Sequence, residues 1–369
     1  MKARTALIVA IVQTILFFGH WFVYETWTEF WQPPDPPGIG AWQIVLMILS
    51  LSFVSASLLA FRSSNIAVRW FYRIAATWLG FMNFLFMAAW LCWLVYFAGK
   101  LTGHTFNRSA IVGFFFGMAI LLSIFGLLNA ASIRVRRITV KLPGLPESWR
   151  GRVAALATDT HLGHVNGARF MRRIVTMLRR SRPDIVFIAG DLYDGTRVDA
   201  EAVAAPWREL SPTFGKYFVT GNHEEFSNPR PFIAAVERSG IRVLKNEMVT
   251  VDGLQVVGVH YYDSTHPDRF RSILASAGLD PASASILLSH APHSLEVGEE
   301  AGISLQLSGH THGGQVFPFT WVTRRIFRRF THGLHRFGSL QVYTSYGAGT
   351  GGPPMRVGSY PEIVLISFE

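Results

Sequence analysis

The chain has almost no cysteine, and long stretches of it carry no charge. Its single cysteine, Cys92, lies inside an apolar run, which excludes an internal disulfide and a cysteine-rich zinc site. Lys, Arg, Asp and Glu are absent from residues 5–24 and 74–99. Half of the 369 residues are hydrophobic, and the mean hydropathy is +0.27. Such a composition is too apolar for an ordinary soluble protein and predicts a membrane part.

Four apolar runs in the first third of the chain are each close to the ~20 residues that cross a bilayer as a helix. Backbone groups in lipid must be satisfied internally, so helices are the economical interpretation. A cleaved signal peptide is the alternative for the first run, but no small-residue cleavage site follows it. We therefore predict an all-α four-helix transmembrane region formed by Leu7–Tyr24, Trp42–Phe61, Ile74–Ala98 and Ala110–Ala130.

Charge is distributed unevenly around these runs. Residues 1–149 hold 11 Lys or Arg against 4 Asp or Glu, whereas residues 150–369 hold 23 against 20. Basic residues precede the first run, separate the second from the third and follow the fourth, while the first loop carries Glu25, Glu29 and Asp35. The positive-inside rule then predicts a multi-pass protein of the cell (inner) membrane with both termini, and hence the rest of the chain, in the cytoplasm. The small excess of positive charge after residue 150 argues against long nucleic acid as a partner.

The chain changes character at Lys141–Gly151. Prolines and glycines there predict a linker between a membrane region at 1–140 and a second domain at 152–369. Beyond it, short apolar runs alternate with amphipathic stretches, of which 168–181 and 231–240 are predicted helices. This alternation indicates an α/β domain. Its predicted buried strands are residues 153–158, 184–190, 216–221, 254–260, 285–290 and 303–309.

Polar side chains follow five of these predicted strands. Ligands gather beyond the carboxyl ends of strands in open α/β sheets, so we expect one site at one edge. Residues i and i+2 of extended backbone point the same way, which would aim such pairs at one ion or at two neighbouring ions. Imidazole, carboxylate and amide groups without a thiolate suit Mn²⁺, Fe²⁺ or Zn²⁺. One ion cannot use all seven candidates, so we predict two ions about 4 Å apart with a shared carboxylate. The candidates are Asp159, His161, Asp191, Asn222, His290, His310 and His312.

Five motifs that contain these residues occur in order: "DTHLG", "GDLYD", "GNHEE", "SHAPH" and "GHTHGGQ". Together they resemble the calcineurin-like metallophosphoesterase family, over about residues 150–369. The resemblance implies a two-sheet sandwich flanked by helices, so we expect an α/β (α+β) metallophosphoesterase fold preceded by the four-helix region. It also implies Asp191 as the bridging carboxylate. The remaining ligands would divide into Asp159, His161 and His312 on one ion, and Asn222, His290 and His310 on the other.

The resemblance also implies roles around the phosphate. His223, beside the ligand Asn222, is expected to face the scissile phosphate, where it would stabilise developing charge or protonate the leaving oxygen. The nucleophile would be a hydroxide that bridges the two ions, with no covalent enzyme intermediate. Asp194 is expected to hold its loop by hydrogen bonds. His164 and His293 flank the motifs and are candidate substrate contacts.

Two further stretches indicate an amphiphilic substrate. "FPFTWVTRRIFRRF", at 317–330, mixes aromatic residues with four arginines, which suits a membrane interface or anionic headgroups. A solvated helix face is the alternative. "YGAGTGGPPMR", at 346–356, resembles an element of the membrane-associated branch of the family, which includes enzymes acting on UDP-2,3-diacylglucosamine and related lipids. Arg356 in this loop is the third candidate substrate contact.

The sequence thus predicts a membrane-anchored dimetal phosphoesterase that hydrolyses a phosphate or pyrophosphate ester, with a lipid-linked substrate as the sharper hypothesis. One alternative is a membrane sensor whose phosphoesterase-like domain only binds a ligand. The nearly charge-free spans give little support to a transport path. The other alternative is a nucleotide phosphodiesterase with the same metal chemistry.

Overall fold

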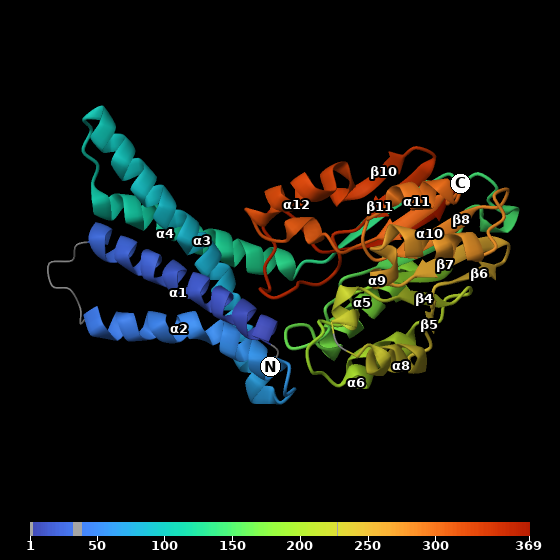
Figure 1. The fold of residues 1–369 in the computed structure, drawn as a ribbon, viewed down its shortest axis with the longest axis horizontal. Coiled ribbons are helices and arrows are strands. Elements are labelled where there is room, and N and C mark those ends of the chain that lie inside the picture. The colour runs from blue at the N-terminus through green and yellow to red at the C-terminus, as the bar shows by residue number, and fades with distance from the viewer. Residues whose placement is uncertain (1–2, 32–38, 227) are drawn as a thin grey trace. The chain divides into compact units, whose positions relative to one another are not determined.

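The structure is a computed structural model that describes residues 3–31, 39–226 and 228–369 (Figure 1). Lys2 and Asp35, which entered the charge argument, lie outside the described residues. The chain divides into two compact units. The first, here called the helix unit, comprises Met1–Leu128 and Gly352–Met355, and the second, here called the sheet unit, comprises Asn129–Gly351 and Arg356–Glu369.

Four long apolar helices account for the helix unit. Each is long and apolar enough to cross a membrane, which confirms the prediction of four potential spans. The third helix extends beyond its apolar run because Asn65 caps its first turn, accepting from the Val68 N–H at 2.8 Å. It ends at Gly103, whose left-handed φ of 71° stops the helix. The helices are α1 (Ala3–Trp31), α2 (Ile39–Ala60), α3 (Ile66–Thr102) and α4 (Arg108–Ala130).

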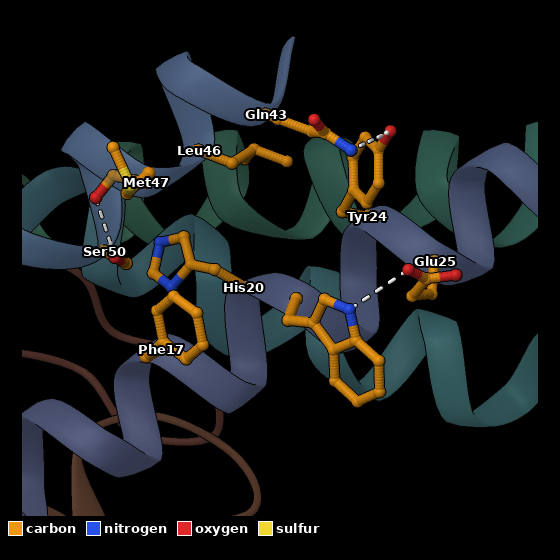
Figure 2. A pocket seen from close by; sticks show the side chains of 9 residues that line it. Phe17, His20, Tyr24, Glu25, Gln43, Leu46, Met47 and Ser50 are labelled. Atoms are coloured by element: carbon orange, nitrogen blue, oxygen red, sulfur yellow. Dashed lines mark hydrogen bonds between the residues drawn. The ribbon is translucent and has the colours of Figure 1, made fainter. Parts of the chain in front are cut away.

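Polar side chains of the helix unit find partners within it. Residues of α1 and α2 line a cavity of about 220 Å³. In it Gln43 donates to the Tyr24 hydroxyl, at 3.2 Å (Figure 2). His20 lines the same cavity and accepts from the indole N–H of Trp78 on α3 at 2.8 Å. Such pairing matters in lipid, where no water replaces a missing partner.

Two six-stranded sheets form the described part of the sheet unit. The strands are β1 (Arg134–Val140), β2 (Val153–Ala157), β3 (Ile185–Ala189), β4 (Lys216–Val219), β5 (Arg242–Val243), β6 (Glu247–Val251), β7 (Leu254–Val259), β8 (Ser285–Ser289), β9 (Leu305–Ser308), β10 (Gly333–Phe337), β11 (Leu340–Thr344) and β12 (Glu362–Phe368). The first sheet has the order β1-β12-β2-β3-β4-β5, and the second has the order β10-β11-β9-β8-β7-β6. Neighbouring strands run parallel from β2 to β5 in the first sheet and from β7 to β9 in the second.

Helices cover the outer faces of the two sheets (Figure 1). One apolar core lies between α5, α8 and the first sheet, and includes Ile174, Val236 and Val186. A second core fills the space between the sheets, and a third joins α10 and α11 to the second sheet. This layering confirms the predicted two-sheet sandwich flanked by helices. The helices are α5 (Ala168–Ser181), α6 (Ala200–Ala204), α7 (Asn222–Glu225), α8 (Arg230–Arg238), α9 (Tyr261–Ser264), α10 (Pro267–Ser276), α11 (Leu295–Glu300) and α12 (Phe319–Phe327), with short 3₁₀ turns η1 (Glu147–Trp149), η2 (Ala205–Glu209), η3 (His312–Gly314) and η4 (Arg328–Thr331).

The predicted strands and helices of the second domain are confirmed to within two residues at each end. β1 lies in the residues that the sequence assigned to the membrane region, yet it belongs to the sheet unit. It pairs in parallel with β12, with Arg134 opposite Glu362. The arginines of β1 also fit a topology signal beside an apolar run, so the sequence pattern does not reveal this strand.

Candidate metal centre

The predicted ligands follow the carboxyl ends of strands in both sheets. β2, β3 and β4 of the first sheet lead into Asp159, Asp191 and Asn222, whereas β8 and β9 of the second lead into His290 and His310. The expectation of a single sheet edge was therefore wrong. A sandwich brings the ends of two parallel sets of strands together, and the candidate site lies between them.

The loops that carry the ligands turn sharply. Five of the seven candidates have a left-handed backbone, which is uncommon for residues other than glycine and costs conformational energy. The prediction that extended backbone aims these side chains was wrong, since a left-handed residue ends the extended path directly after the strand. Surrounding packing must hold these residues, as it does at many functional sites. The φ values are 51° for Asp159, 47° for His161, 49° for Asp191, 69° for His310 and 47° for His312.

Asp159, His161 and His312 form the first donor group, with ligand atoms within 4.8 Å of one another. The Nε2 atoms of the two histidines lie 2.8 Å apart, and Nε2 of His312 lies 3.5 Å from a carboxylate oxygen of Asp159. His161 is buried, and its Nδ1 has no hydrogen-bond partner among the described residues. Ring nitrogens turned toward one another and toward a carboxylate suit a divalent cation.

Asp191, Asn222, His290 and His310 form the second donor group. Nε2 of His290 lies 3.2 Å from a carboxylate oxygen of Asp191 and 3.1 Å from the side-chain oxygen of Asn222. That amide oxygen also lies 3.0 Å from Nδ1 of His310. The group therefore offers two imidazoles, a carboxylate and an amide oxygen from both sheets.

Asp191 belongs to both halves of the site. The same carboxylate lies 3.8 Å from Nε2 of His161, which is in the first donor group. One carboxylate between two donor groups is what a dinuclear centre requires, so the residues fit a pair of ions.

Two of the histidines have the protonation that metal binding requires, whereas His290 must lose a proton to coordinate an ion. Burial lowers the pKa of His161 and of His310 to about 3, so both rings are neutral, the form that coordinates a metal. Burial also opposes a charge on His290, but the carboxylate of Asp191 outweighs it and raises the pKa of His290 to about 10. Burial raises the pKa of Asp159 to about 6. Buried charges gathered in this way are costly unless they are paired or coordinate metals.

Comparison with known proteins agrees with this geometry. The calcineurin-like phosphoesterase family matches residues 153–314. A protein of Aquifex aeolicus described as an uncharacterized metallophosphoesterase is 30% identical over 262 residues, which are 68% of this chain and 98% of that protein. The chain belongs to the calcineurin-like metallophosphoesterase family. The family uses a dinuclear metal centre, which the two donor groups match.

Other relatives share only part of their length with this metallophosphoesterase. A Danio rerio protein described as a transmembrane protein with metallophosphoesterase domain is 33% identical over 264 residues, which cover 67% of this chain and 60% of that protein. The chain thus spans less than two thirds of that relative. A solved structure of a dimetal phosphatase from Danio rerio covers 53% of this chain and 87% of its own, with 14% identity and a TM-score of 0.33, too low to carry an argument.

His223 stands beside the shared carboxylate of the metallophosphoesterase site. Its Nδ1 lies 2.8 Å from the backbone oxygen of Asp194, and its Nε2 lies 4.0 Å from a carboxylate oxygen of Asp191. A carbonyl oxygen only accepts, so Nδ1 carries a proton and Nε2 is directed toward the site. Asp194 also accepts from the backbone N–H of Thr196 at 2.9 Å and of His164 at 3.3 Å, which orders the loop that holds His223.

Glu224, which the sequence leaves open between support of the ligands and a solvated position, is a structural member of the site. Its buried carboxylate accepts from the backbone N–H groups of Asp191, Tyr193 and Gly221, at 2.9, 2.8 and 2.7 Å. It therefore ties the loop after β3 to the loop after β4. An available signal was the acid three residues after a strand-ending glycine, the spacing of a capping box. The neighbouring Glu225 accepts from the backbone N–H of Tyr262 at 3.0 Å and so links α7 to α9.

Glycine is required where the ligand loops approach one another. A Cβ atom on Gly221 would lie 2.1 Å from a carboxylate oxygen of Asp191, and one on Gly309 would lie 2.0 Å from a carboxylate oxygen of Asp159. Both distances are far below van der Waals contact. Any side chain at either position would displace a carboxylate ligand.

The three candidate substrate contacts lie in different surroundings. Arg356 is fully buried, and its guanidinium donates to the backbone oxygens of Gly349 at 2.6 Å and His312 at 2.9 Å, and lies 3.0 Å from Nδ1 of His312. These contacts support a role in orienting His312. His164 is buried, with Nδ1 3.0 Å from the Thr196 hydroxyl, whereas His293 is partly exposed and packs beside His310. Contact of each with substrate stays a prediction.

Proposed function

We propose that the protein is a metal-dependent phosphoric ester hydrolase, acting on a phosphate mono- or diester or a pyrophosphate. The observation that carries this proposal is the pair of donor groups joined by Asp191, with Nε2 of His223 directed toward them. We further propose that two divalent ions of Mn, Fe or Zn occupy the two donor groups. Such a pair, when bound, lowers the pKa of water and so furnishes a hydroxide nucleophile near neutral pH.

The chain's own residues then position the phosphate and handle its charge. His223 donates its Nδ1–H to the carbonyl of Asp194, so Nε2 accepts while the ring is neutral, and it donates to, or protonates, the leaving oxygen when Nε2 carries a second proton. Asn222 presents its side-chain oxygen to the second donor group and fixes the start of α7, from which His223 projects. The Asp191 carboxylate accepts from the backbone N–H of His223 at 2.9 Å, so metal ligand and acid are held together.

Turnover of a simple phosphodiester tests this function. The full chain, purified in detergent, is supplied with Mn²⁺ and bis-p-nitrophenyl phosphate. Asp191→Ala and His223→Ala should each abolish metal-dependent release of nitrophenol, whereas His266→Ala, at an exposed position on the surface, should retain it. Turnover that is absent from the wild type, or unchanged in both site variants, would refute the proposal.

The same preparation separates the rival functions. Stoichiometric metal binding without turnover of any phosphoester would favour the sensor alternative. Turnover confined to cyclic or linear nucleotides would favour a nucleotide phosphodiesterase. Elemental analysis of the protein as purified identifies the native metals.

We propose that the sheet unit works at the cytoplasmic face of the cell membrane. The four apolar helices, and the description of the Danio rerio relative as a transmembrane protein, support a place at the membrane. The basic residues around the helices support the cytoplasmic side. Cys92 is the single cysteine, so a Cys92→Ser, Ser272→Cys variant carries one thiol on α10. A membrane-impermeant maleimide should label it only after cells are lysed. Labelling in intact cells would place the sheet unit outside.

We propose a lipid-linked phosphoester as the substrate class. An enzyme held at the membrane meets such substrates at high local concentration, and the motif at 346–356 resembles that of enzymes acting on UDP-2,3-diacylglucosamine. Phosphoesters that accumulate in the membranes of cells lacking the protein should include the substrate. Accumulation of soluble phosphoesters alone would argue against this class.

A further inference from the structure

The surface of the sheet unit has one concentration of exposed apolar side chains. After residue 130, six large apolar side chains of the described structure are exposed, and four of them lie on α12. The exposed fractions are 57% for Phe319, 65% for Trp321, 54% for Val322 and 63% for Ile326. An exposed apolar patch on one short helix marks an interaction surface rather than scattered surface residues.

These side chains form a helical face. Phe319, Val322 and Ile326 follow the spacing i, i+3, i+7, which places them along one side of α12. Thr320 is buried, and Phe327 packs inward against His293 with ring centroids 5.3 Å apart. One side of α12 therefore packs on the sheet unit while another presents apolar groups outward.

Positive charge borders this face. Residues 317–331 contain Arg324, Arg325, Arg328 and Arg329 and no acidic residue. Among the described residues, none of the four forms an ion pair with a carboxylate. An amphipathic helix with apolar residues on one face and arginines beside them is the composition of helices that lie in a bilayer interface, where arginine meets lipid phosphate.

Helix α5 shows that basicity alone does not explain α12. It carries Arg169, Arg172, Arg173, Arg179 and Arg180, but Met171, Ile174, Val175 and Leu178 are all buried in the core. None of its large apolar side chains is among the exposed ones. α5 is thus a solvated basic helix, and α12 combines charge with an unpartnered apolar face.

The short connection between α4 and β1 favours a bilayer as the partner of the exposed face of α12. Only residues 131–133 separate the end of α4 from the start of β1. Four Cα–Cα steps from Ala130 to Arg134 span at most about 14 Å. If α4 crosses the membrane, the sheet unit cannot leave the lipid surface, and the effective concentration of that surface is permanently high. A second copy or another protein would have to compete with it.

The inner end of α12 meets the metal centre. The ring of Phe327 lies 6.0 Å from that of His310, a member of the second donor group, and 5.3 Å from that of His293. Eight residues after His310 the chain reaches Pro318, the N-cap of α12. A surface that engages α12 therefore lies next to the site.

We propose that α12 is an interfacial helix, which inserts the face of Phe319, Val322 and Ile326 into an anionic leaflet and sets its arginines among lipid phosphates. The inference deepens the proposed function, because it explains how a phosphoester in the bilayer reaches the site. The insertion can be tested without turnover, because a label on α12 reports whether the helix lies in lipid.

Site-directed fluorescence tests the insertion. The full chain with Cys92→Ser and Val322→Cys carries a single environment-sensitive nitrobenzoxadiazole label on α12, and the matched control carries it at Ser272→Cys on α10. In nanodiscs of phosphatidylcholine with phosphatidylglycerol, the label at 322 should shift to the blue and be quenched by spin-labelled lipid, while the label at 272 should do neither. The shift should weaken in phosphatidylcholine alone. Absence of lipid quenching at 322 would overturn the proposal, as would a blue shift that appears in detergent and grows with protein concentration, the mark of a second copy.

Charge and activity provide a second readout. Arg325→Gln with Arg329→Gln should weaken the lipid-dependent shift, whereas the matched pair Arg172→Gln with Arg180→Gln on α5 should not. In the same nanodiscs, Val322→Glu with Ile326→Glu should lower hydrolysis of hexadecyl p-nitrophenyl phosphate about tenfold, the effect expected from losing buried apolar contacts, with hydrolysis of bis-p-nitrophenyl phosphate unchanged. Equal loss on both substrates would overturn the link to the site. If neither substrate is turned over by the wild type, the proposed function fails, while the fluorescence still decides the insertion.

Discussion

The helix unit presents many large apolar side chains at its surface, whereas the sheet unit buries most of its apolar groups. Of the large apolar side chains exposed in the described structure, 37 precede residue 130 and six follow it. In the sheet unit the apolar groups fill cores between the sheets and beneath the helices. The two units are thus built for different solvents. In the described sheet unit, α12 is the element that presents several large apolar side chains at the surface, as the helices of the helix unit do.

Polar groups differ between the units in the same way. In the helix unit, hydroxyls such as those of Thr26 and Ser123 donate to the carbonyl four residues earlier, at 2.8 Å in both cases. In the sheet unit, Thr158 donates to Ala189, 31 residues away, at 2.9 Å. Local pairing survives the loss of tertiary structure, and distant pairing does not. The sheet unit should therefore be the unit that single polar substitutions damage.

The largest effect is the loss of turnover expected when Asp191, which contacts both donor groups, is changed. Asp191→Asn keeps the shape of the side chain but removes the charge shared by both donor groups. A metal centre supplies several kcal/mol of charge stabilisation, so turnover should fall about 10³-fold, since each 1.36 kcal/mol is a factor of ten. Steady-state kinetics with bis-p-nitrophenyl phosphate measures the loss. A loss under tenfold, with metal content unchanged, would mean that Asp191 does not bridge.

The sequence predicted which residues meet at this centre because five of the seven candidate ligands directly follow a short apolar run that ends at a glycine, serine or threonine. The other two, His161 and His312, lie two residues further along. It did not predict how they are aimed. Asp159 and Asp191 have a left-handed backbone, and their contacts come from residues far along the chain, which no local pattern records. The carboxylate of Asp159 accepts from the backbone N–H of His310 at 3.0 Å, and the backbone N–H of Asp191 donates to Glu224 at 2.9 Å. The same limit leaves Glu224 open between a solvated side chain and a support of the ligands, because only the fold brings three backbone amides to its carboxylate.

Strands were predicted best where both faces are buried. β3 and β8 are continuous apolar runs, and both were found. β1 was missed because three of its seven residues are arginines beside a membrane span, where the topology rule competes with the strand pattern. The burial of Arg356 is a second feature that the sequence did not predict. Arginine is usually exposed, so its burial against His312 could not be inferred from the loop that carries it.

Metal removal should lower the stability of the sheet unit alone. Ligand saturation at 100 times the dissociation constant contributes about 2.7 kcal/mol, and each kcal/mol shifts the melting temperature of a domain this size by about 2–4 °C. Chelation should therefore lower the sheet-unit transition and leave the helix unit unaffected. Differential scanning calorimetry in detergent, with EDTA and then added Mn²⁺, follows both transitions. Equal movement of both would show that the units melt together.

A buried lysine offers a smaller test. Lys216 donates to the backbone oxygens of Trp207 and Leu210 at 2.6 and 2.7 Å. Lys216→Met removes this donor from both, and the Trp207 oxygen keeps the N–H of Leu210 at 3.3 Å. The loss should be about 1–3 kcal/mol, the cost of unsatisfied buried groups. Denaturant unfolding of the sheet-unit transition measures it, with Lys245→Met, at an exposed residue, as the control.

The pH dependence of that variant provides an independent check. Burial lowers the pKa of Lys216 in the folded chain. Between this lowered pKa and the ordinary lysine pKa the unfolded state binds more protons than the folded state, so in that interval this group makes the wild type more stable as pH rises. Lys216→Met should lack this rise. A parallel pH profile in both proteins would show that Lys216 titrates normally.

The smallest effect is expected for one hydrogen bond in the helix unit, and a tryptophan pair isolates it. Trp78 donates to His20 at 2.8 Å within the helix unit, and Trp149 donates to the carbonyl of Val251 at 3.1 Å in the sheet unit. Tryptophan to phenylalanine removes the same N–H from each. Hydrogen bonds between membrane helices average about 0.6 kcal/mol, whereas carbonyls left buried cost about 1–3 kcal/mol.

Trp78→Phe should therefore cost less than Trp149→Phe, measured by titration with SDS for the helix unit and with urea for the sheet unit. The physical reason is the reference state. An unfolded helix unit keeps its helices in the micelle, and His20 finds another donor there, whereas unfolding the sheet unit exposes Val251 to water and reforms its bond only with solvent. Thr26, which accepts from Trp93 at 3.0 Å, provides a repeat within the helix unit. If Trp78→Phe and Trp93→Phe each cost more than Trp149→Phe, the helix unit depends on distant pairings as much as the sheet unit does, and the contrast between the two fails.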